Sequence, residues 1–115
     1  MLSEFNIITL FPKLIEQWLE TGIIAKAHES KLFDISTTDL RDFGIGDYRQ
    51  VDDAPYGGGP GMVLMSEPID KAILSSKSDI NIFLTPSGKQ LDENLISKLH
   101  SYSSANIICG RYEGF

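Results

Sequence analysis

The sequence has little cysteine, no long hydrophobic run and few basic residues. Its single cysteine, Cys109, excludes an internal disulfide and agrees with a reducing compartment. No apolar run approaches the roughly 20 residues that a membrane-spanning helix needs, and the N-terminus lacks the basic region of a signal peptide. The sequence therefore predicts a cytoplasmic protein with no membrane partner.

Basic residues are outnumbered: ten Lys and Arg face sixteen Asp and Glu, for a formal net charge of −6. This excess of negative charge argues against binding of a nucleic-acid phosphate backbone by this chain alone. At 115 residues the chain is long enough for one modest core, so we predict a single domain over residues 1–115. Residues 107–115 pass from a strand pattern into a glycine-bracketed loop with nothing after it, and we expect the natural protein to continue beyond Phe115.

Short apolar runs alternate with amphipathic segments along the chain. Pro12 suits the first turn of a helix, and Ser66 and Asp92 suit the caps of two later ones. Such alternation is typical of an α/β fold with a parallel sheet and helices on both faces. Ligands of such sheets bind beyond the carboxyl ends of the strands. The predicted strands cover residues 5–10, 32–38, 80–84 and 105–109, and the predicted helices begin at residues 12 and 23 and directly after the caps Ser66 and Asp92.

The stretch from Tyr48 to Met62 is too particular in composition for an ordinary connector. Four of the five residues from Gly57 to Gly61 are glycine, so another molecule can approach the backbone closely there. Pro55 and Pro60 restrain the backbone on either side of Gly57. The stretch lacks the Lys-Ser/Thr of a P-loop and the spacing of a dinucleotide fingerprint. A plain surface turn or flexible linker is the alternative interpretation.

Two further loops follow predicted strands. Residues 85–88 and Gly110 to Gly114 come after strands that flank one crossover helix, so we expect the two loops to lie side by side. The second loop presents an arginine, a phenol and a carboxylate between glycines. Plain turns remain the alternative for both loops.

No metal site is predicted. Asp52 and Asp53, helped by Asp42 or Asp47, have the oxygen ligands of a divalent cation, but a solvated acidic loop is the favoured interpretation. His28 and His100 form no ligand spacing.

Three segments, taken together, carry a resemblance to a known family. They are Arg49 to Met62, Leu84 to Gly88 and Ile108 to Gly114. In this order and spacing they strongly resemble the bacterial TrmD-type tRNA (guanine-N1)-methyltransferases of the SPOUT class. The opening residues Ile7 to Pro12 look like that family's first strand and turn.

The resemblance implies an S-adenosyl-L-methionine-binding domain whose later segment threads a trefoil knot, completed beyond this chain. It also implies a homodimer that transfers a methyl group to N1 of the guanosine on the 3′ side of the tRNA anticodon. The catalytic base, an aspartate, and the C-terminal tRNA-binding domain are both expected beyond Phe115, so the fragment itself is expected to be inactive.

The resemblance also assigns residues. It implies cofactor contacts from Phe83, Leu84, Pro86, Gly110, Tyr112, Glu113 and Gly114. It implies substrate contacts from Arg49, Asp52, Pro55, Tyr56, Gly57, Gly58 and Gly59.

Two other functions remain open at this point. One is a non-catalytic dimerisation or nucleotide-binding module. The other is a metal-dependent phosphoryl-transfer enzyme that uses Asp42, Asp52 and Asp53.

Overall fold

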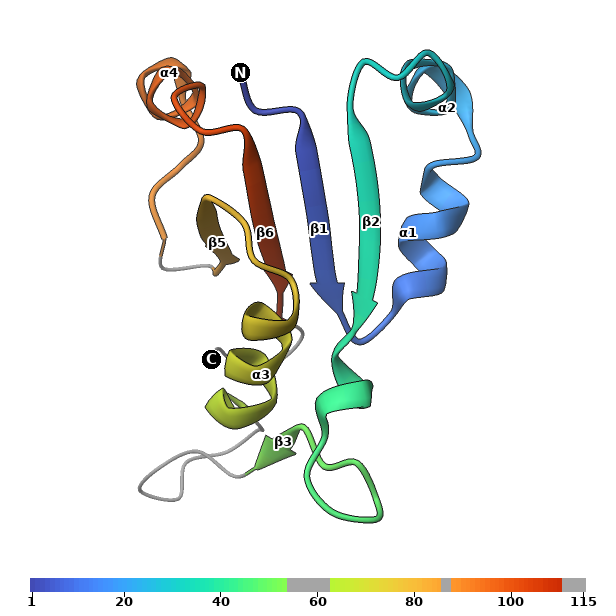
Figure 1. Ribbon diagram of the computed structural model, residues 1–115, viewed down its shortest axis with the longest axis vertical. Coiled ribbons are helices and arrows are strands. Elements are labelled where there is room, and N and C mark those ends of the chain that lie inside the picture. The colour runs from blue at the N-terminus through green and yellow to red at the C-terminus, as the bar shows by residue number, and fades with distance from the viewer. Residues whose placement is uncertain (54–62, 86–87, 111–115) are drawn as a thin grey trace.

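The computed structural model describes residues 1–53, 63–85 and 88–110, apart from the side chains of Asp53 and Val63. Four strands form one parallel sheet in the order β2-β1-β6-β5 (Figure 1). They are β1 (Glu4–Thr9), β2 (Asp34–Asp39), β5 (Ile80–Leu84) and β6 (Ser104–Cys109). The predicted α/β class and parallel sheet are therefore confirmed.

Within the described residues, four α-helices connect the strands. They are α1 (Pro12–Trp18), α2 (Gly22–Glu29), α3 (Ser66–Ser75) and α4 (Glu93–Leu99), and a 3-10 turn, η1 (Leu40–Phe43), follows β2. Figure 1 shows α3 beside the lower, carboxyl part of the sheet, with α1 and α2 beyond β2. None of the described helices has the length and apolar character needed to cross a membrane.

The predicted helix caps have different outcomes. Asp92 caps α4 as expected, because its Oδ1 accepts a hydrogen bond of 2.8 Å from the Leu95 N–H. Ser66 is not a cap: Met65 holds that position, and Ser66 is already helical. Pro68, third in the helix, has no N–H, so one of the donors that a capping side chain would normally satisfy does not exist.

The segment between β2 and α3 contains structure that the sequence did not reveal. Ile45 and Gln50 form an isolated antiparallel bridge, and β3 (Asp52–Asp53) pairs with β4 (Val63–Leu64). Strands of two residues are too short to show an alternating pattern.

The core lies between the sheet, α3 and this small hairpin. Its buried members are Ile8, Leu10, Leu40, Val51, Leu64, Ile69, Ala72 and Ile108. Val51 and Leu64 are only 7% and 2% exposed, so both ends of the glycine-rich stretch are anchored in the core. The Met65 N–H also donates to the Val51 carbonyl at 2.7 Å, which joins the two ends directly.

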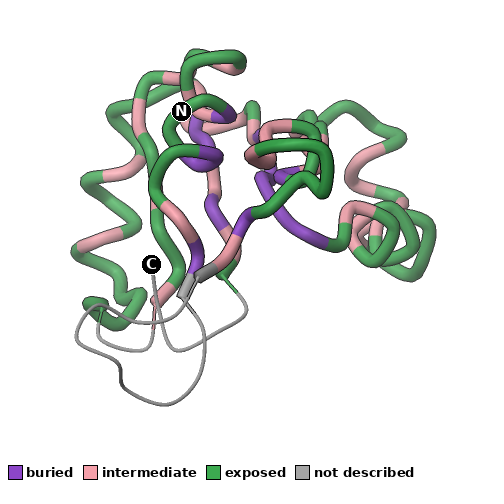
Figure 2. The backbone as a smooth tube through the Cα atoms, turned by 90° about the horizontal axis from the view of Figure 1, so that it is seen from below, coloured by how far each residue is buried: buried purple, intermediate pink, exposed green. Residues whose placement is uncertain are grey.

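The remaining helices pack loosely. In α1, α2 and α4, all of whose residues are described, no side chain is buried. Leu14 and Trp18, on the apolar face of α1, are 62% and 47% exposed. Figure 2 shows the buried segments in the interior and the outer helices mostly exposed.

Candidate functional site

The carboxyl ends of β5 and β6 lie next to each other. Leu84 pairs with Cys109 in the parallel register, so the chain leaves the sheet at Thr85 and Gly110 from neighbouring positions. The Gly88 N–H donates to the Thr85 carbonyl at 3.1 Å, so the two described residues on either side of the first loop lie close together. The prediction that the two loops lie side by side is thus confirmed for their first residues, Thr85 and Gly110.

A cavity of about 580 Å³ runs along β5 and under α4. Its volume falls within the range of small-molecule sites, roughly 300–1,000 Å³. Phe83 and Leu84 line it at the carboxyl end and are 44% and 54% exposed. The other lining residues are mostly apolar and include Phe5, Ile82, Leu91, Leu95, Leu99 and Ile107. Such a wall suits the planar ring and the methylene groups of a nucleoside ligand.

A second cavity lies at the opposite, amino-terminal edge. It measures about 600 Å³ and is lined by Ser3, Glu4, His28, Glu29, Lys31, Phe33 and Asp34. His28 Nε2 lies 3.8 Å from Asp34 Oδ1, and the His28 ring lies 5.9 Å from that of Phe33. We favour the cavity along β5, because ligands of open parallel sheets bind at the carboxyl ends of the strands.

Arg49 is held in a constrained loop outside the core. Its φ of 51° is one that residues other than glycine rarely adopt. Paired bonds of 2.8 and 2.9 Å between the backbones of Ile45 and Gln50 close the loop, and a Cβ at Gly44 would overlap the backbone of Arg49. Arg49 Nη1 lies 3.7 Å from Asp42 Oδ1, but both side chains are mostly exposed, so this ion pair contributes little to stability.

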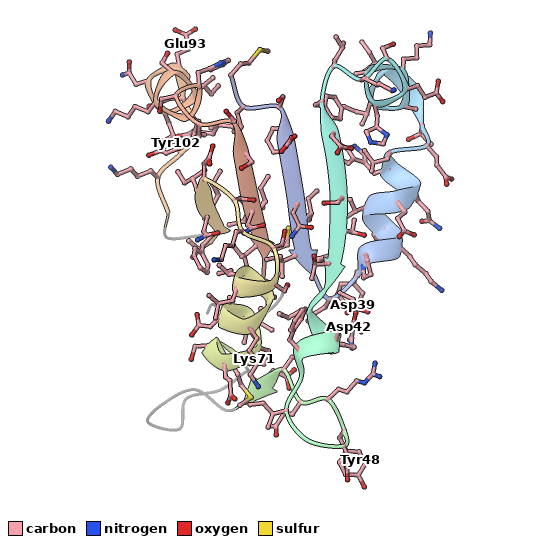
Figure 3. The ribbon with its side chains drawn as sticks, viewed as in Figure 1. Asp39, Asp42, Tyr48, Lys71, Glu93 and Tyr102 are labelled. Atoms are coloured by element: carbon pink, nitrogen blue, oxygen red, sulfur yellow. The ribbon has the colours of Figure 1, made fainter. Side chains whose placement is uncertain are left out.

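The tip of this loop points away from the body of the protein. Figure 3 shows Tyr48 at its far end, with Asp39 and Asp42 nearer the sheet, and Tyr48 is 98% exposed. Asp52 lies in β3, where its carbonyl accepts a 2.9 Å bond from the Gln50 side chain. Arg49 thus lies in the loop that Ile45 and Gln50 close, and Asp52 lies in the β3–β4 hairpin that follows it.

Several predicted site residues lie outside the described residues. On the cofactor side they are Pro86, Tyr112, Glu113 and Gly114, and on the substrate side Pro55, Tyr56, Gly57, Gly58 and Gly59. The cofactor and substrate contacts that the resemblance implies for these residues therefore stay predictions.

Arg41 is a residue that the sequence analysis missed. Its Nη1 donates to the Leu10 carbonyl, its guanidinium carbon lies 5.7 Å from the Phe11 ring centroid, and its backbone N–H donates to Asp39 Oδ1 at 3.0 Å. It thereby ties together the segments that follow β1 and β2 at the carboxyl edge. The Asp39-Leu40-Arg41 spacing could have predicted the turn at Arg41, because aspartate side chains in turns often accept a hydrogen bond from the backbone N–H two residues later.

The chemistry of the described residues is that of binding. Burial raises the pKa of the Cys109 thiol, which disfavours a thiolate nucleophile. Among residues 1–53, 63–85 and 88–110, no group of three His, Cys, Asp or Glu side chains is arranged to hold a metal ion. The apolar cavity beside two strand ends is the feature best suited to a ligand.

Comparison with known proteins identifies the family. The sequence profile described as "tRNA (Guanine-1)-methyltransferase TrmD" matches residues 3–115. The chain belongs to this family.

Relatives from distant bacteria agree over nearly the whole chain. A tRNA (guanine-N(1)-)-methyltransferase of Nitrosomonas europaea is 40% identical over 96% of this chain, and one of Mycoplasma capricolum is 45% identical over 97%. These matches cover 44% and 48% of the two relatives. The chain thus spans about half the length of the TrmD relatives that it matches.

A solved structure agrees with the fold. The crystal structure of the tRNA (m1G37) methyltransferase from Aquifex aeolicus superimposes with a TM-score of 0.79 at 38% identity. The match covers 99% of this chain and 53% of that protein.

Proposed function

We propose that the protein, at its natural full length, transfers a methyl group from S-adenosyl-L-methionine to N1 of the guanosine on the 3′ side of the tRNA anticodon. The family match over residues 3–115 is the observation that carries this proposal. The names of the relatives, which describe tRNA (guanine-N1) methyltransferases, support the substrate and the reaction. A tRNA substrate implies a cytoplasmic location.

The cofactor side of the site is assigned to the carboxyl ends of β5 and β6. Phe83 and Leu84 would contact the adenosine from the cavity wall, and Gly110 would offer backbone without a side chain in the way. By family resemblance, Pro86, Tyr112, Glu113 and Gly114 complete this side.

The substrate side is assigned to the hairpin and the glycine-rich stretch. Asp52 lies in the β3–β4 hairpin, whose ends are fixed by the buried Val51 and Leu64, and Arg49 lies in the preceding loop that Ile45 and Gln50 close. Pro55, Tyr56, Gly57, Gly58 and Gly59 would wall the guanine. A second copy of the chain in a homodimer would bring the two sides together.

Bound S-adenosylmethionine supplies a methyl group activated by a sulfonium. Displacement from sulfur to nitrogen needs the two partners in line, so the main task of these residues is to bind, orient and exclude water. The N1 proton must also leave, which requires a carboxylate or similar base. We assign that base outside residues 1–115, together with the tRNA-binding domain and the completion of the trefoil knot. We also propose that helices cover both faces of the sheet.

The reaction is tested on the protein at its natural full length. With radiolabelled S-adenosylmethionine and a tRNA transcript that carries guanosine 3′ to the anticodon, we expect label in 1-methylguanosine. A transcript with adenosine at that position is the control and should stay unlabelled. Absence of transfer to the guanosine transcript would refute the proposal, and ligand binding that strictly requires Mg²⁺ would favour the metal-dependent alternative.

The location of the site is tested by a pair of variants. Leu84→Glu places a carboxylate in the cavity, and we expect S-adenosylhomocysteine binding, measured by calorimetry, to weaken about tenfold or more. Leu74→Glu is the matched control, because Leu74 is 70% exposed on α3 and does not line the cavity. Equal affinities for the two variants would place the cofactor elsewhere.

A further inference from the structure

A chain of polar side chains crosses the whole sheet. Each strand contributes one residue at the same level: Asn6 pairs with Ser36 and with Asn106, and Asn106 pairs with Asn81. Ser36 Oγ donates to Asn6 Oδ1 at 3.1 Å, Asn6 Nδ2 to Asn106 Oδ1 at 3.2 Å, and Asn106 Nδ2 to Asn81 Oδ1 at 3.0 Å. The hydrogen bonds therefore run without a break from β2 to β5.

The centre of this chain is fully buried. Asn106 is 0% exposed and Asn6 is 7% exposed. Asn106 Nδ2 also donates to the Ser76 carbonyl at 2.6 Å, so the segment after α3 joins the network. Every buried side-chain polar atom of the described residues has a hydrogen-bond partner. Breaking this arrangement would leave buried polar groups unpaired, which costs about 1–3 kcal/mol for each group.

The network matters most for β5. This five-residue strand is at the edge of the sheet, and its last two residues are exposed. Its apolar residues Ile80, Ile82 and Leu84 share one face, so a slip of two residues against β6 would still put apolar side chains on that face. Apolar packing alone therefore specifies the register of β5 weakly.

Two polar contacts remove this ambiguity. Asn81 accepts from Asn106, and two residues earlier the Asp79 carboxylate accepts from the backbone N–H groups of Ser103 and Ser104 at 2.9 and 3.3 Å. The Asp79 N–H in turn donates to Ser104 Oγ at 3.0 Å. We call Asp79 and Asn81, with these partners on β6 and on Ser103 directly before it, the β5 clamp. Only one register satisfies all of its bonds.

The clamp determines where the cofactor loops begin. Asn81 pairs with Asn106, and three residues later on each strand Leu84 pairs with Cys109. A slip of two residues would move Thr85 by about 7 Å relative to Gly110. Polar residues that fix register in otherwise apolar contacts are known from coiled coils.

We propose that Asp79 and Asn81 are positioning residues for the methyl-donor site: through the β5 clamp they set the register that holds Thr85 beside Gly110. The inference rests on the proposed function for the identity of the ligand, but not for the register itself. Asp79 does not line the candidate cavity, and Asn81 lines it on the amino-terminal half of β5, away from Thr85 and Gly110. We therefore assign both residues a role through the placement of the two loops.

Two double variants distinguish the effect of losing the hydrogen-bond acceptors of the β5 clamp from the effect of changing its two side chains. Asp79→Ala with Asn81→Leu removes both acceptors, whereas Asp79→Asn with Asn81→Asp exchanges the two side chains and keeps an acceptor oxygen at each position. The exchange also leaves composition and net charge unchanged. Both positions are exposed, so both proteins are expected to fold.

The register is measured by a disulfide. Cys109 is the sole cysteine of the sequence, and Leu84→Cys places a second thiol on its paired residue. Neighbouring strands lie about 4.8 Å apart, within the Cα separation of disulfides. With copper phenanthroline as oxidant we expect ready cross-linking in the unsubstituted and exchange backgrounds, and about fivefold less in the Ala/Leu background. Equal cross-linking in all three would overturn the proposal.

The consequence for the site is measured with Leu84 intact, on the protein at its natural full length. By calorimetry, the Ala/Leu variant should bind S-adenosylhomocysteine about tenfold more weakly and the exchange variant like the unsubstituted protein. Ile69→Ala, which removes a core side chain on α3, controls for lost stability and should keep the original affinity.

The outcomes distinguish the two claims. Unchanged affinity in the Ala/Leu variant would refute the positioning role. If the unsubstituted protein bound no S-adenosylhomocysteine, the proposed function would fail, and the cross-linking yields would still decide whether the clamp fixes the register.

Discussion

Single polar residues in the strands of the sheet carry much of the specificity of this fold. β1, β5 and β6 each contain Asn followed by Ile, and in each strand the asparagine stands at the same distance from the carboxyl end. The three asparagines meet because the register aligns them. A polar residue at a buried position is stabilising only when its partners are in place, so each asparagine favours the native pairing over its alternatives.

Asn106 is the residue on which this network depends most. Asn106→Leu would leave the Asn6 amide and the Ser76 carbonyl without their partner, and we expect the free energy of unfolding to fall by about 3 kcal/mol in urea denaturation. Asn81→Leu, at the exposed end of the network, should lower it by about 1 kcal/mol. Equal losses for the two variants would contradict this account of the interior.

Cys109 provides a test at the end of β6. Because burial raises the pKa of its thiol, the folded protein should react with iodoacetamide more slowly than the unfolded chain at mildly alkaline pH. The folded state holds this proton more tightly. The contribution of the protonated Cys109 thiol to the free energy of unfolding is therefore complete at pH values below the ordinary thiol pKa. It is lost as the pH rises through the raised pKa of the folded state. Identical alkylation rates for folded and unfolded protein would show that the thiol is not buried.

At the scale of elements, α4 forms one wall of the candidate cavity. Leu95 and Leu99 face the cavity, and Asp92 fixes the start of the helix by capping the Leu95 N–H. None of the residues of α4 is buried, so the cap is a substantial part of what holds this helix in its place.

Removal of the cap should therefore be measurable. Asp92→Ala is expected to lower the free energy of unfolding by about 1 kcal/mol, whereas Asp92→Asn, which retains an acceptor oxygen, should lower it by much less. Thermal denaturation of the two variants side by side gives the comparison. A stable Asp92→Ala protein would mean that α4 is held by other contacts.

Elements with a strong local signal were predictable from the sequence. β5 has the predicted bounds, Ile80 to Leu84, and Asp92 caps α4 as expected, because strand patterns and caps depend on neighbouring residues. The asparagine network was not predicted, because β1 and β6 pair across about 100 residues and only the strand order brings Asn6 to Asn106. The β3–β4 hairpin was missed because its strands are so short.

The candidate site was predictable only in part. The neighbouring starts of the loops after Leu84 and Cys109 follow from the general rule for parallel sheets, and the structure confirms them. The cavity under α4 depends on how the helix packs, which periodicity does not specify.

At the scale of the whole molecule, charge and packing both suggest that the site is shared. The net charge of −6 disfavours tRNA binding by this chain alone, and the outer helices expose apolar side chains. The relatives that it matches are about twice as long. These observations are consistent with our proposal that the chain is the cofactor-binding half and that the RNA contacts come largely from outside these residues.

The most direct test of the central claim is a crystal structure of the protein at its natural full length with S-adenosylhomocysteine. We predict that the ligand lies at the carboxyl ends of β5 and β6, in contact with Leu84, Thr85 and Gly110. Density for the ligand at the opposite edge of the sheet, in the cavity beside Ser3 and His28, would contradict the account.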